Sequence, residues 1–431
     1  MSHKGFPALV QPRLPFFYGW VILACVCCAG FARQGPAVAT LSIFVEPMTG
    51  EFGWSRTGMS AAVSLGGILA ALTSPMLGTL LDRHGARAML CWAVLTTGVC
   101  AILLAFTQSL TYFIIFFCIA RTNFAGPFDL GIYGAINNWF VRDRGIATSI
   151  STIALMAGLV AMPLLAQAAI VYDGWRAGWI AVGMTVLLVG FVPSWLLMVR
   201  RPEDMGLVPD GGRLSAPNDN PDQRPSFQHE PRFTRAQALR TPAFWLLSLY
   251  TALVYPVQAG VSLHQAPHLI ERGIDATSAA LMIGVFSFSC AVSGFASGVV
   301  LRWISVRITL ALSAIGLAAG AYLMTWIASD FDGYYTAVVF GLGIGGVLTV
   351  LPIAWADYFG RTSFGAIRGI ALTVQVVAQA LGPVMSGVLR DVTGDYDVAL
   401  LLFAGLATVA IVSALFTGAP DPPTSGSESP A

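Results

Sequence analysis

Arg33, Arg121 and Asp129 lie inside long apolar stretches of the sequence, where an ionised side chain is costly unless it has a partner or a function. A helix rises about 1.5 Å per residue, which places Arg33 roughly 20 Å beyond Trp20 and Arg121 near the middle of its own stretch. Two guanidinium groups at such depth could bind a carboxylate through paired hydrogen bonds. For each arginine, the alternative is a structural ion pair that locks two helices together.

Asp129 follows Arg121 by eight residues in the sequence. On a straight helix this is about 12 Å along the axis and about 80° around it, which is too far for an easy intrahelical ion pair. Asp129 therefore needs another partner or a proton. Because a partly dry cavity disfavours the charged form of a carboxyl group, Asp129 could take up and release protons. A basic residue on a neighbouring helix is an equally open explanation.

Several uncharged polar side chains also lie within apolar stretches and could complete a pocket around a small ligand. Each of them could equally make a hydrogen bond between two helices. They are Gln34, Tyr133, Tyr250, Tyr255, Gln258 and Gln375.

The composition places these residues in a membrane. The 431-residue chain is 56% hydrophobic and 10% charged, with a mean hydropathy of +0.73, which excludes a soluble globular protein. Apolar runs of about 20 residues fit membrane-spanning helices and not the shorter alternating strands of a barrel, so the fold class is an all-α membrane protein in the lipid bilayer. The net charge of +1 and the dispersed basic residues exclude a nucleic-acid partner.

No cofactor or metal site is predicted. His264 and His268 are interpreted as part of a solvated loop, because they lack further ligands at the spacing of a metal site. The run Gly341–Gly346 lies in an apolar stretch without a following Lys-Ser or Lys-Thr, so close helix packing explains it better than a nucleotide-binding loop. The cysteines all lie within apolar runs and behave as small hydrophobic residues; they are Cys25, Cys27, Cys28, Cys91, Cys100, Cys118 and Cys290.

Twelve apolar runs are long enough to cross a bilayer. They cover residues 17–45, 58–81, 88–107, 111–137, 146–170, 176–199, 243–264, 278–300, 307–328, 333–356, 367–389 and 397–417.

The basic residues outside these spans concentrate on one side of the membrane. The other side carries Arg56, Arg176, Arg272 and Arg390. Because the side richer in Lys and Arg faces the cytoplasm, both termini are predicted to be cytoplasmic.

The spans group into two bundles around one polar stretch. We expect a cytoplasmic N-terminus at 1–16, a six-helix bundle at 17–199, a cytoplasmic linker loop at 200–242, a second six-helix bundle at 243–417 and a disordered tail at 418–431. Residues 200–207 could form a short interfacial helix, and the Pro-rich centre of the linker is expected to be mobile.

The two halves repeat each other. Arg144-Gly145-Ile146-Ala147 opens the fifth span, and Arg368-Gly369-Ile370-Ala371 opens the eleventh. Two six-helix repeats in the same orientation, with a site near the midplane between them, are an architecture of transporters.

The hairpin between the second and third spans carries the most specific motif, Gly-Thr-Leu-Leu-Asp-Arg-His-Gly-Ala-Arg. Its residues Gly78, Asp82, Arg83, Gly85 and Arg87 resemble the loop signature of the major facilitator superfamily of transporters. The second half has a degenerate copy in which Gly298 and Arg307 match Gly78 and Arg87, whereas Arg302 stands in place of Asp82.

Further stretches resemble the branch of this superfamily that holds the monocarboxylate and oxalate/formate transporters. Two departures bear on the substrate: Ala37 follows Pro36 where that branch often has Lys, and residues 278–300 contain no basic residue. The resembling stretches are Tyr18-Gly19-Trp20, Glu51-Phe52-Gly53-Trp54-Ser55-Arg56, Trp139-Phe140, Gly174-Trp175-Arg176 and Tyr358-Phe359-Gly360-Arg361.

The resemblance also implies a gate. In the family, the acid that matches Asp82 lies beside the cytoplasmic start of the eleventh span, here near Gly365 to Gly369. Asp82 would be stabilised there by the helix dipole and by Arg368, and Arg144 occupies the matching position of the first half.

The expected function is therefore secondary active transport of small organic anions, similar to monocarboxylates, by a monomer whose two bundles rock about a central site. Proton-coupled import is favoured over exchange. A drug-like compound exporter of the same fold is one alternative, and a membrane enzyme or sensor is another. The lack of an intramembrane catalytic cluster counts against an enzyme, and the lack of a soluble sensory domain counts against a sensor.

Overall fold

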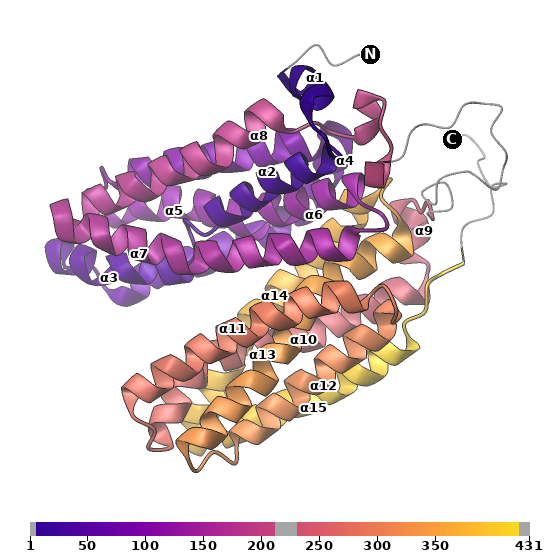
Figure 1. Ribbon diagram of the computed structural model, residues 1–431. Coiled ribbons are helices and arrows are strands. Elements are labelled where there is room, and N and C mark those ends of the chain that lie inside the picture. Colours follow the sequence, from indigo (N-terminus) through magenta and orange to yellow (C-terminus); the bar gives the residue numbers. More distant parts are fainter. Residues whose placement is uncertain (1–5, 212–230, 422–431) are drawn as a thin grey trace. The chain divides into compact units, whose positions relative to one another are not determined.

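The computed structural model describes residues 6–211 and 231–421, and the regular elements in these two ranges are all helical (Figure 1). The chain divides into two compact units, Met1–Leu214 and Ser215–Ala431. The Pro-rich centre of the linker and most of the C-terminal tail, for which the sequence predicts disorder, lie outside the described residues.

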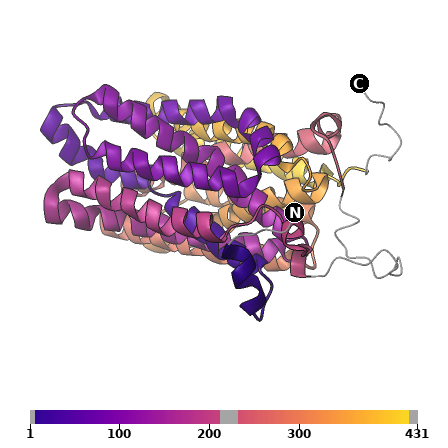
Figure 2. The same cartoon turned by 90° about the horizontal axis from the view of Figure 1, so that it is seen from above.

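The helices of the N-terminal unit run along one another (Figure 2). They are α1 (Phe6–Val10), η1 (Gln11–Arg13), α2 (Gly19–Ala32), α3 (Val38–Phe52), α4 (Arg56–Leu104), α5 (Leu110–Ala125), α6 (Pro127–Trp139), α7 (Arg144–Thr185), the π-helical η2 (Val186–Phe191), α8 (Val192–Leu197), and the 3-10 helices η3 (Pro202–Met205) and η4 (Pro209–Gly211).

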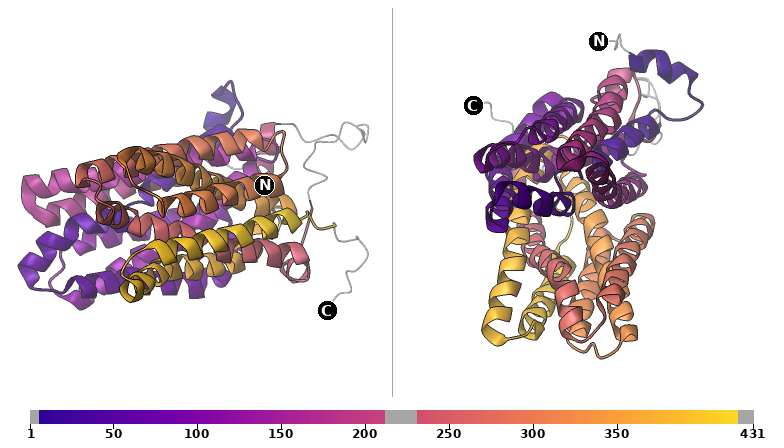
Figure 3. Two further views of the ribbon diagram at one scale, coloured as in Figure 1. Left: turned by 90° about the horizontal axis from the view of Figure 1, so that it is seen from below. Right: turned by 90° about the vertical axis from the view of Figure 1, so that its left-hand side faces the viewer.

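The long helices of the C-terminal unit also lie side by side (Figure 3). Its elements are α9 (Arg235–Leu239), α10 (Pro242–Glu271), α11 (Ala276–Val300), α12 (Val306–Met324), α13 (Asp330–Phe359), α14 (Phe364–Thr393) and α15 (Asp397–Phe416).

Nine helices in the described ranges are long and apolar enough to cross a membrane. Two of these continuous stretches turn back on themselves, α4 at Gly85 and α7 at Asp173-Gly174, where the backbone leaves the helical region. If each turn separates two crossings and α2 with α3 form one more, the segments correspond to the twelve predicted spans. The all-α membrane fold is thus confirmed.

Two predicted spans differ from a single straight helix. The first is interrupted between α2 and α3, and the fourth is interrupted at Gly126 between α5 and α6. Both interruptions contain a Gly-Pro pair, Gly35-Pro36 and Gly126-Pro127. Proline cannot continue the hydrogen-bond ladder of a preceding helix but fits the first turn of a new one, so each pair ends one helix and allows another to begin.

The outer surfaces of the helices suit a bilayer. Large apolar side chains such as Leu72, Met76 and Phe288 are exposed along helix faces, where lipid would cover them. Exposed tryptophans lie near helix ends, as in the aromatic belts of membrane proteins. They are Trp20, Trp195, Trp245, Trp303 and Trp326, whereas the exposed Trp92 lies within α4.

In the C-terminal unit, glycines let α13 approach its neighbours at backbone distance. A Cβ atom on Gly343 would lie 2.6 Å from the amide nitrogen of Leu317 in α12, and one on Gly345 would overlap the carbonyl oxygen of Cys290 in α11. The interpretation of the Gly341–Gly346 run as close helix packing is therefore confirmed.

Each described end of the linker is attached to the unit that it adjoins. The carboxylate of Asp210 accepts hydrogen bonds from three successive backbone amides, those of Val141 (3.1 Å), Arg142 (2.8 Å) and Asp143 (3.3 Å), just before α7. At the other end, the amide of Phe233 donates to the carbonyl of Phe359 at the end of α13 (3.3 Å). The sequence prediction of a short helix near residues 200–207 corresponds to η3.

Candidate functional site

The interrupted helices of the N-terminal unit explain why charged side chains are tolerated inside apolar stretches. Arg33 is the residue at which α2 ends, and Asp129 lies in the first turn of α6. The C-terminal end of a helix carries a partial negative charge and the N-terminal end a partial positive charge. Each charged residue thus meets a helix end of opposite sign, which contributes about 0.3–1 kcal/mol and up to about 2 kcal/mol in partly buried sites.

Arg33 and Asp129 form an ion pair. Arg33 Nη2 lies 3.7 Å from Asp129 Oδ2, and the two side chains are 12% and 6% exposed. The pair joins α2 to α6, so the partner of Asp129 comes from a neighbouring helix, as in the second explanation that the sequence left open. The distance exceeds that of a hydrogen bond, so this contact leaves hydrogen-bonding capacity on the guanidinium.

Arg121 lies close to the same aromatic ring as Arg33. The guanidinium carbon of Arg121 is 4.3 Å from the centroid of the Phe124 ring, and that of Arg33 is 4.6 Å from the same centroid. Gly66 of α4 makes room for the Arg121 side chain, because a Cβ atom there would lie 2.6 Å from Arg121 Cβ. One aromatic ring therefore holds two like charges near each other.

These two guanidinium groups carry buried donors that lack acceptors within the described protein. Arg121 Nε and Nη1 and Arg33 Nε are buried and make no hydrogen bond. A buried donor without an acceptor costs about 1–3 kcal/mol, and more when the group is charged. An anion with several oxygen atoms is the chemical partner that such an arrangement favours.

Gln34 and Tyr133 extend the polar region. Gln34 is 3% exposed and its Oε1 has no hydrogen-bond partner, whereas its backbone carbonyl accepts from Thr40 Oγ1 (2.8 Å) across the break between α2 and α3. Tyr133 is buried one turn after Asp129 on α6. The structure thus brings Arg33, Gln34, Arg121, Asp129 and Tyr133 onto α2, α5 and α6 of a single unit.

Sequence reasoning missed Phe124, although its spacing from Arg121 places it one helical turn away. It also missed the interruptions, and the straight-helix geometry from Arg121 to Asp129 does not apply across Gly126. The Gly-Pro pairs could have predicted the interruptions, since such dipeptides mark turns and breaks between helices.

Tyr250, Gln258 and Gln375, predicted as pocket residues, make hydrogen bonds within the C-terminal unit. The Tyr250 hydroxyl donates to the Leu310 carbonyl of α12 (2.9 Å), which is the interhelical bond that the sequence left open. Gln379 Nε2 donates to Gln258 Oε1 (3.2 Å), and Arg368 Nη2 donates to Gln375 Oε1 (2.5 Å). Tyr255 is buried beside Pro256 in α10.

The interpretation of His264 and His268 as a solvated loop is wrong. Both lie inside α10, which continues to Glu271, and His268 is 3% exposed. His264 contacts the Tyr396 hydroxyl through Nδ1 (3.2 Å) and the Pro383 carbonyl through Nε2 (3.4 Å). The apolar segment does not end at the histidines because partners on other helices satisfy their ring nitrogens.

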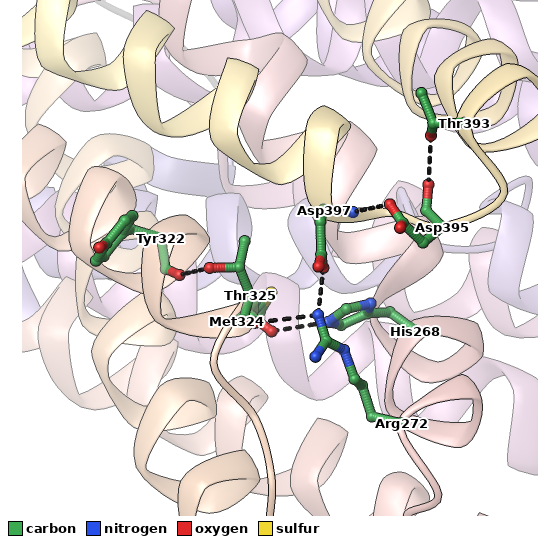
Figure 4. Close-up of polar contacts among 8 residues, drawn as sticks. All are labelled: His268, Arg272, Tyr322, Met324, Thr325, Thr393, Asp395 and Asp397. Carbon is green, nitrogen blue, oxygen red and sulfur yellow. Dashed lines mark hydrogen bonds and ion pairs between the residues drawn. The ribbon is translucent and has the colours of Figure 1, made fainter.

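Figure 4 shows the hydrogen bonds that His268 and Arg272 make at the end of α12. His268 Nε2 lies 2.8 Å from the carbonyl oxygen of Met324, so this nitrogen carries the hydrogen, and Arg272 Nη2 donates to the next carbonyl, that of Thr325 (3.0 Å). Arg272 also pairs with Asp397 at the start of α15. Two side chains of α10 thereby cap the last carbonyls of α12, which is a structural role.

The residues predicted to form the gate lie at the end of the N-terminal unit where the linker begins. Gly85 has φ +84° and forms the turn of α4, and a Cβ atom there would overlap the Arg200 side chain. Arg87 donates to the Trp195 carbonyl (2.8 Å), and Arg200 donates to the Asp82 carbonyl (2.9 Å). The turn therefore packs against the end of α8 and the start of the linker.

The other predicted gating residues lie on helices near unit ends. Gly78 and Arg83 lie within α4. Arg144 begins α7, is buried, and donates through Nε to the Phe140 carbonyl (3.3 Å). Arg368, in the first turns of α14, is also buried. Gating by these residues stays a prediction.

Comparison with known proteins identifies relatives of this chain. A sequence model described as Major Facilitator Superfamily matches residues 22–375 and 267–431. The chain is 26% identical over 360 residues to the membrane sensor protein UhpC of Salmonella typhimurium, which covers 80% of this chain and 79% of the relative. It is 24% identical over 429 residues to human monocarboxylate transporter 11, covering 94% of this chain and 85% of the relative.

A solved structure shares the fold. The proton:xylose symporter XylE superposes with a TM-score of 0.73 at 13% sequence identity, covering 93% of this chain and 96% of that one. At this level of identity the likeness concerns the fold alone.

Proposed function

Because the chain belongs to the Major Facilitator Superfamily, we propose that it transports small organic anions similar to monocarboxylates, coupled to protons, across a cell membrane. The observation that carries the proposal is the buried guanidinium of Arg121, whose Nε and Nη1 have no acceptor. Arg33 supplies a second guanidinium over the same Phe124 ring. A carboxylate with a short organic group would satisfy these donors.

Three further features support the proposal. A human relative that matches 94% of this chain is named as a monocarboxylate transporter. Asp129, 4% exposed, is an acidic group within reach of the same site and could carry the proton. The distribution of Lys and Arg favours cytoplasmic termini, and we take the monomer as the working unit.

The anion site is tested by replacing each arginine with lysine. Purified protein would first be screened by thermal shift against pyruvate, lactate, acetate and benzoate, because a ligand that binds the native state raises Tm. Arg121→Lys should weaken binding of the best anion by about tenfold or more, since lysine cannot reproduce the planar fork and a charge-assisted hydrogen bond contributes about 1.5–3 kcal/mol. Arg33→Lys should weaken it as well.

Arg176→Lys is the matched control, because Arg176 is an exposed arginine of the same unit that pairs with Glu51. Its anion affinity should equal that of the unaltered protein. Normal binding by both Arg33→Lys and Arg121→Lys would place the anion site elsewhere.

Proton coupling is tested with Asp129→Asn in proteoliposomes. The variant should lose uptake driven by a pH gradient but keep exchange of labelled for unlabelled anion, because exchange needs no net proton movement. Uptake that still follows the pH gradient would rule out Asp129 as the coupling group.

A sensor without transport is the second candidate, and the 26% identity to UhpC is the observation that favours it. The same proteoliposomes separate the two functions. A transporter exchanges labelled anion across the membrane, whereas a pure sensor binds the anion and moves none.

A further inference from the structure

Residues 6–17, here called the N-terminal segment, expose three large apolar side chains. Phe6, Leu9 and Phe16 are 53%, 66% and 52% exposed. Phe6 and Leu9 are three residues apart in α1, so they lie on the same face of this short helix. Exposed apolar side chains that gather in one short segment mark a surface that another molecule or an apolar phase covers.

The position of the N-terminal segment points to the surface of the bilayer. Figures 1 and 3 show α1 (indigo) beside the long helices of its unit and not among them, at the end where α2 begins. α1 contacts α8, and the Tyr18 hydroxyl donates to the Leu197 carbonyl at the end of α8 (2.9 Å). Trp20 in α2 and Trp195 in α8 are exposed near this end, as expected where lipid headgroups meet acyl chains. The apolar face of the segment is therefore continuous with the lipid-facing surface of the unit.

The opposite side of the segment is held by the protein. The Phe17 ring packs against Trp139 and Phe140, with 5.9 and 6.0 Å between ring centroids. A Cβ atom on Gly211, at the described end of the linker, would lie 3.2 Å from the Phe17 side chain. Phe17 thus fixes the segment to the loop before α7, whereas its neighbour Phe16 is turned outward and left for lipid.

The charge of this part of the chain suits an anionic surface. Residues 1–17 contain Lys4 and Arg13 and no acidic residue, and the first acid of the chain is Glu46. Arg13 ends η1 and is exposed. A long arginine side chain can lie along apolar groups while its guanidinium reaches phosphate oxygens. Exposed apolar side chains with basic neighbours are typical of segments that lie on anionic membranes.

We propose that the N-terminal segment is a membrane-surface anchor that binds anionic phospholipids in the leaflet at this end of the unit. Its three exposed apolar side chains contact acyl chains, and Arg13 contacts headgroup phosphates. The contact adds a lipid-binding surface to a part of the chain that lies outside the membrane-spanning helices. It does not depend on which solute the protein transports.

The depth of the segment is measured with a spin label at Leu9→Cys. The full-length chain, with its seven cysteines replaced by serine, is placed in nanodiscs of phosphatidylcholine and phosphatidylglycerol that hold one copy each, so a second copy cannot cover the segment. Oxygen concentrates in lipid and a nickel chelate in water. We expect oxygen to relax the Leu9→Cys label more strongly. At Arg142→Cys, an exposed position in the loop before α7, the nickel chelate should dominate.

The contribution of charge is measured from the ratio of immobilised to mobile label at Leu9→Cys. Arg13→Gln should lower this ratio about fivefold in discs with phosphatidylglycerol, which is the effect of one basic residue near an anionic surface. The same variant should leave the ratio unchanged in phosphatidylcholine alone. Arg142→Gln, which removes an exposed arginine from the loop before α7, should not change the ratio in either lipid.

Two results would overturn the anchor. One is a Leu9→Cys label that meets the nickel chelate as readily as the Arg142→Cys label does. The other is a ratio that is the same with and without phosphatidylglycerol. If the cysteine-free chain does not fold, hydrogen exchange of the unaltered chain decides. The amides between Ala8 and Phe17 should exchange more slowly in discs with phosphatidylglycerol than in discs without it, and equal rates would refute the proposal.

Discussion

Phe124 contacts two guanidinium groups, which would otherwise repel each other. Both guanidinium carbons lie within 4.6 Å of its ring centroid. A cation over an aromatic face is stabilised by about 0.5–1 kcal/mol when exposed and by about 2 kcal/mol when desolvated. The ring therefore positions the arginines without itself donating a hydrogen bond to the ligand.

We expect Phe124→Leu to weaken pyruvate binding by about five- to thirtyfold, which corresponds to about 1–2 kcal/mol of lost cation–π stabilisation. Phe124→Tyr should bind nearly as well as the unaltered protein because the aromatic face remains. Calorimetric titration measures both. Phe116→Leu is the control on the same helix, since Phe116 packs against Tyr112 and not against an arginine. Equal affinities for Phe124→Leu and Phe116→Leu would contradict this role.

At the scale of residues, the sequence identified the charged groups but not their pairing. The cost of burying a charge is enough to mark Arg33, Arg121 and Asp129 in an apolar sequence. Which of them form an ion pair depends on how α2 packs against α6. A local sequence pattern does not reveal how two helices pack. Phe124 lies one helical turn after Arg121 in the sequence, but the sequence does not show that Arg33 reaches the same ring.

At the scale of elements, Glu51 ties the end of α3 to the second half of α7. Its carboxylate accepts hydrogen bonds from Trp175 Nε1 (2.6 Å) and from both terminal nitrogens of Arg176 (3.1 and 2.7 Å). The hydrogen bonds from Arg176 and then from Trp175 hold the pKa of Glu51 below its ordinary value of 4.5. The folded state thus binds fewer protons at this group than the unfolded chain does.

This lowered pKa predicts a pH dependence of stability. The stabilisation by Glu51 is fully present above pH 4.5 and is lost as the pH falls through the folded-state pKa. We expect Glu51→Gln to have a lower Tm than the unaltered protein at pH 7, and the gap to close as the pH falls below the folded-state pKa of Glu51. A difference in Tm that stays constant with pH would mean that the packing of Glu51, and not its charge, is responsible. Arg176→Gln should show the same dependence of this Tm difference on pH.

The sequence predicted the number and order of the elements better than their continuity. Hydropathy reports how long a segment stays apolar, so it located the spans. It does not report where the backbone leaves the helical ladder, so the breaks at Gly35-Pro36 and Gly126-Pro127 were missed, and α10 was ended too early at His264. Hydropathy scores Arg33, Asp129 and His264 as unfavourable inside a helix. In the structure, each of these side chains has a partner on another helix.

At the scale of the whole molecule, the internal repeat is unequal. α10 and α13 are the counterparts of the interrupted first and fourth spans, yet both are continuous across 30 residues. The Gly-Pro breaks and the Arg33–Asp129 pair therefore distinguish the N-terminal unit. The sequence revealed the repeat through matching motifs at span boundaries, but whether the two halves do the same chemistry depends on residues inside the spans.

The cytoplasmic latch at Asp82 stays a prediction at this scale. If the Asp82 carboxylate stabilises the outward-facing state, Asp82→Asn should raise the inward-open population, and a loss of about 1.4 kcal/mol would shift the ratio about tenfold. Distances between spin labels on the hairpins at Gly85 and near Arg302 would report the shift. Asp173→Asn, in the turn at the other end of the unit, is the control. The same distance distribution in Asp82→Asn and the unaltered protein would exclude the latch.

The glycine contacts of α13 have a mechanical consequence for the C-terminal unit. Because Gly343 and Gly345 bring α13 against the backbones of α12 and α11, no side chain separates the helices at these two contacts, and the three helices should resist sliding there. α10 and α14 also meet at backbone distance, because a Cβ atom on Gly382, next to Pro383, would overlap the carbonyl oxygen of Pro256. Each proline removes one hydrogen bond from its helix at this crossing. Pro352 does the same in α13, so bending of these helices should be concentrated at the prolines and resisted at the glycine contacts.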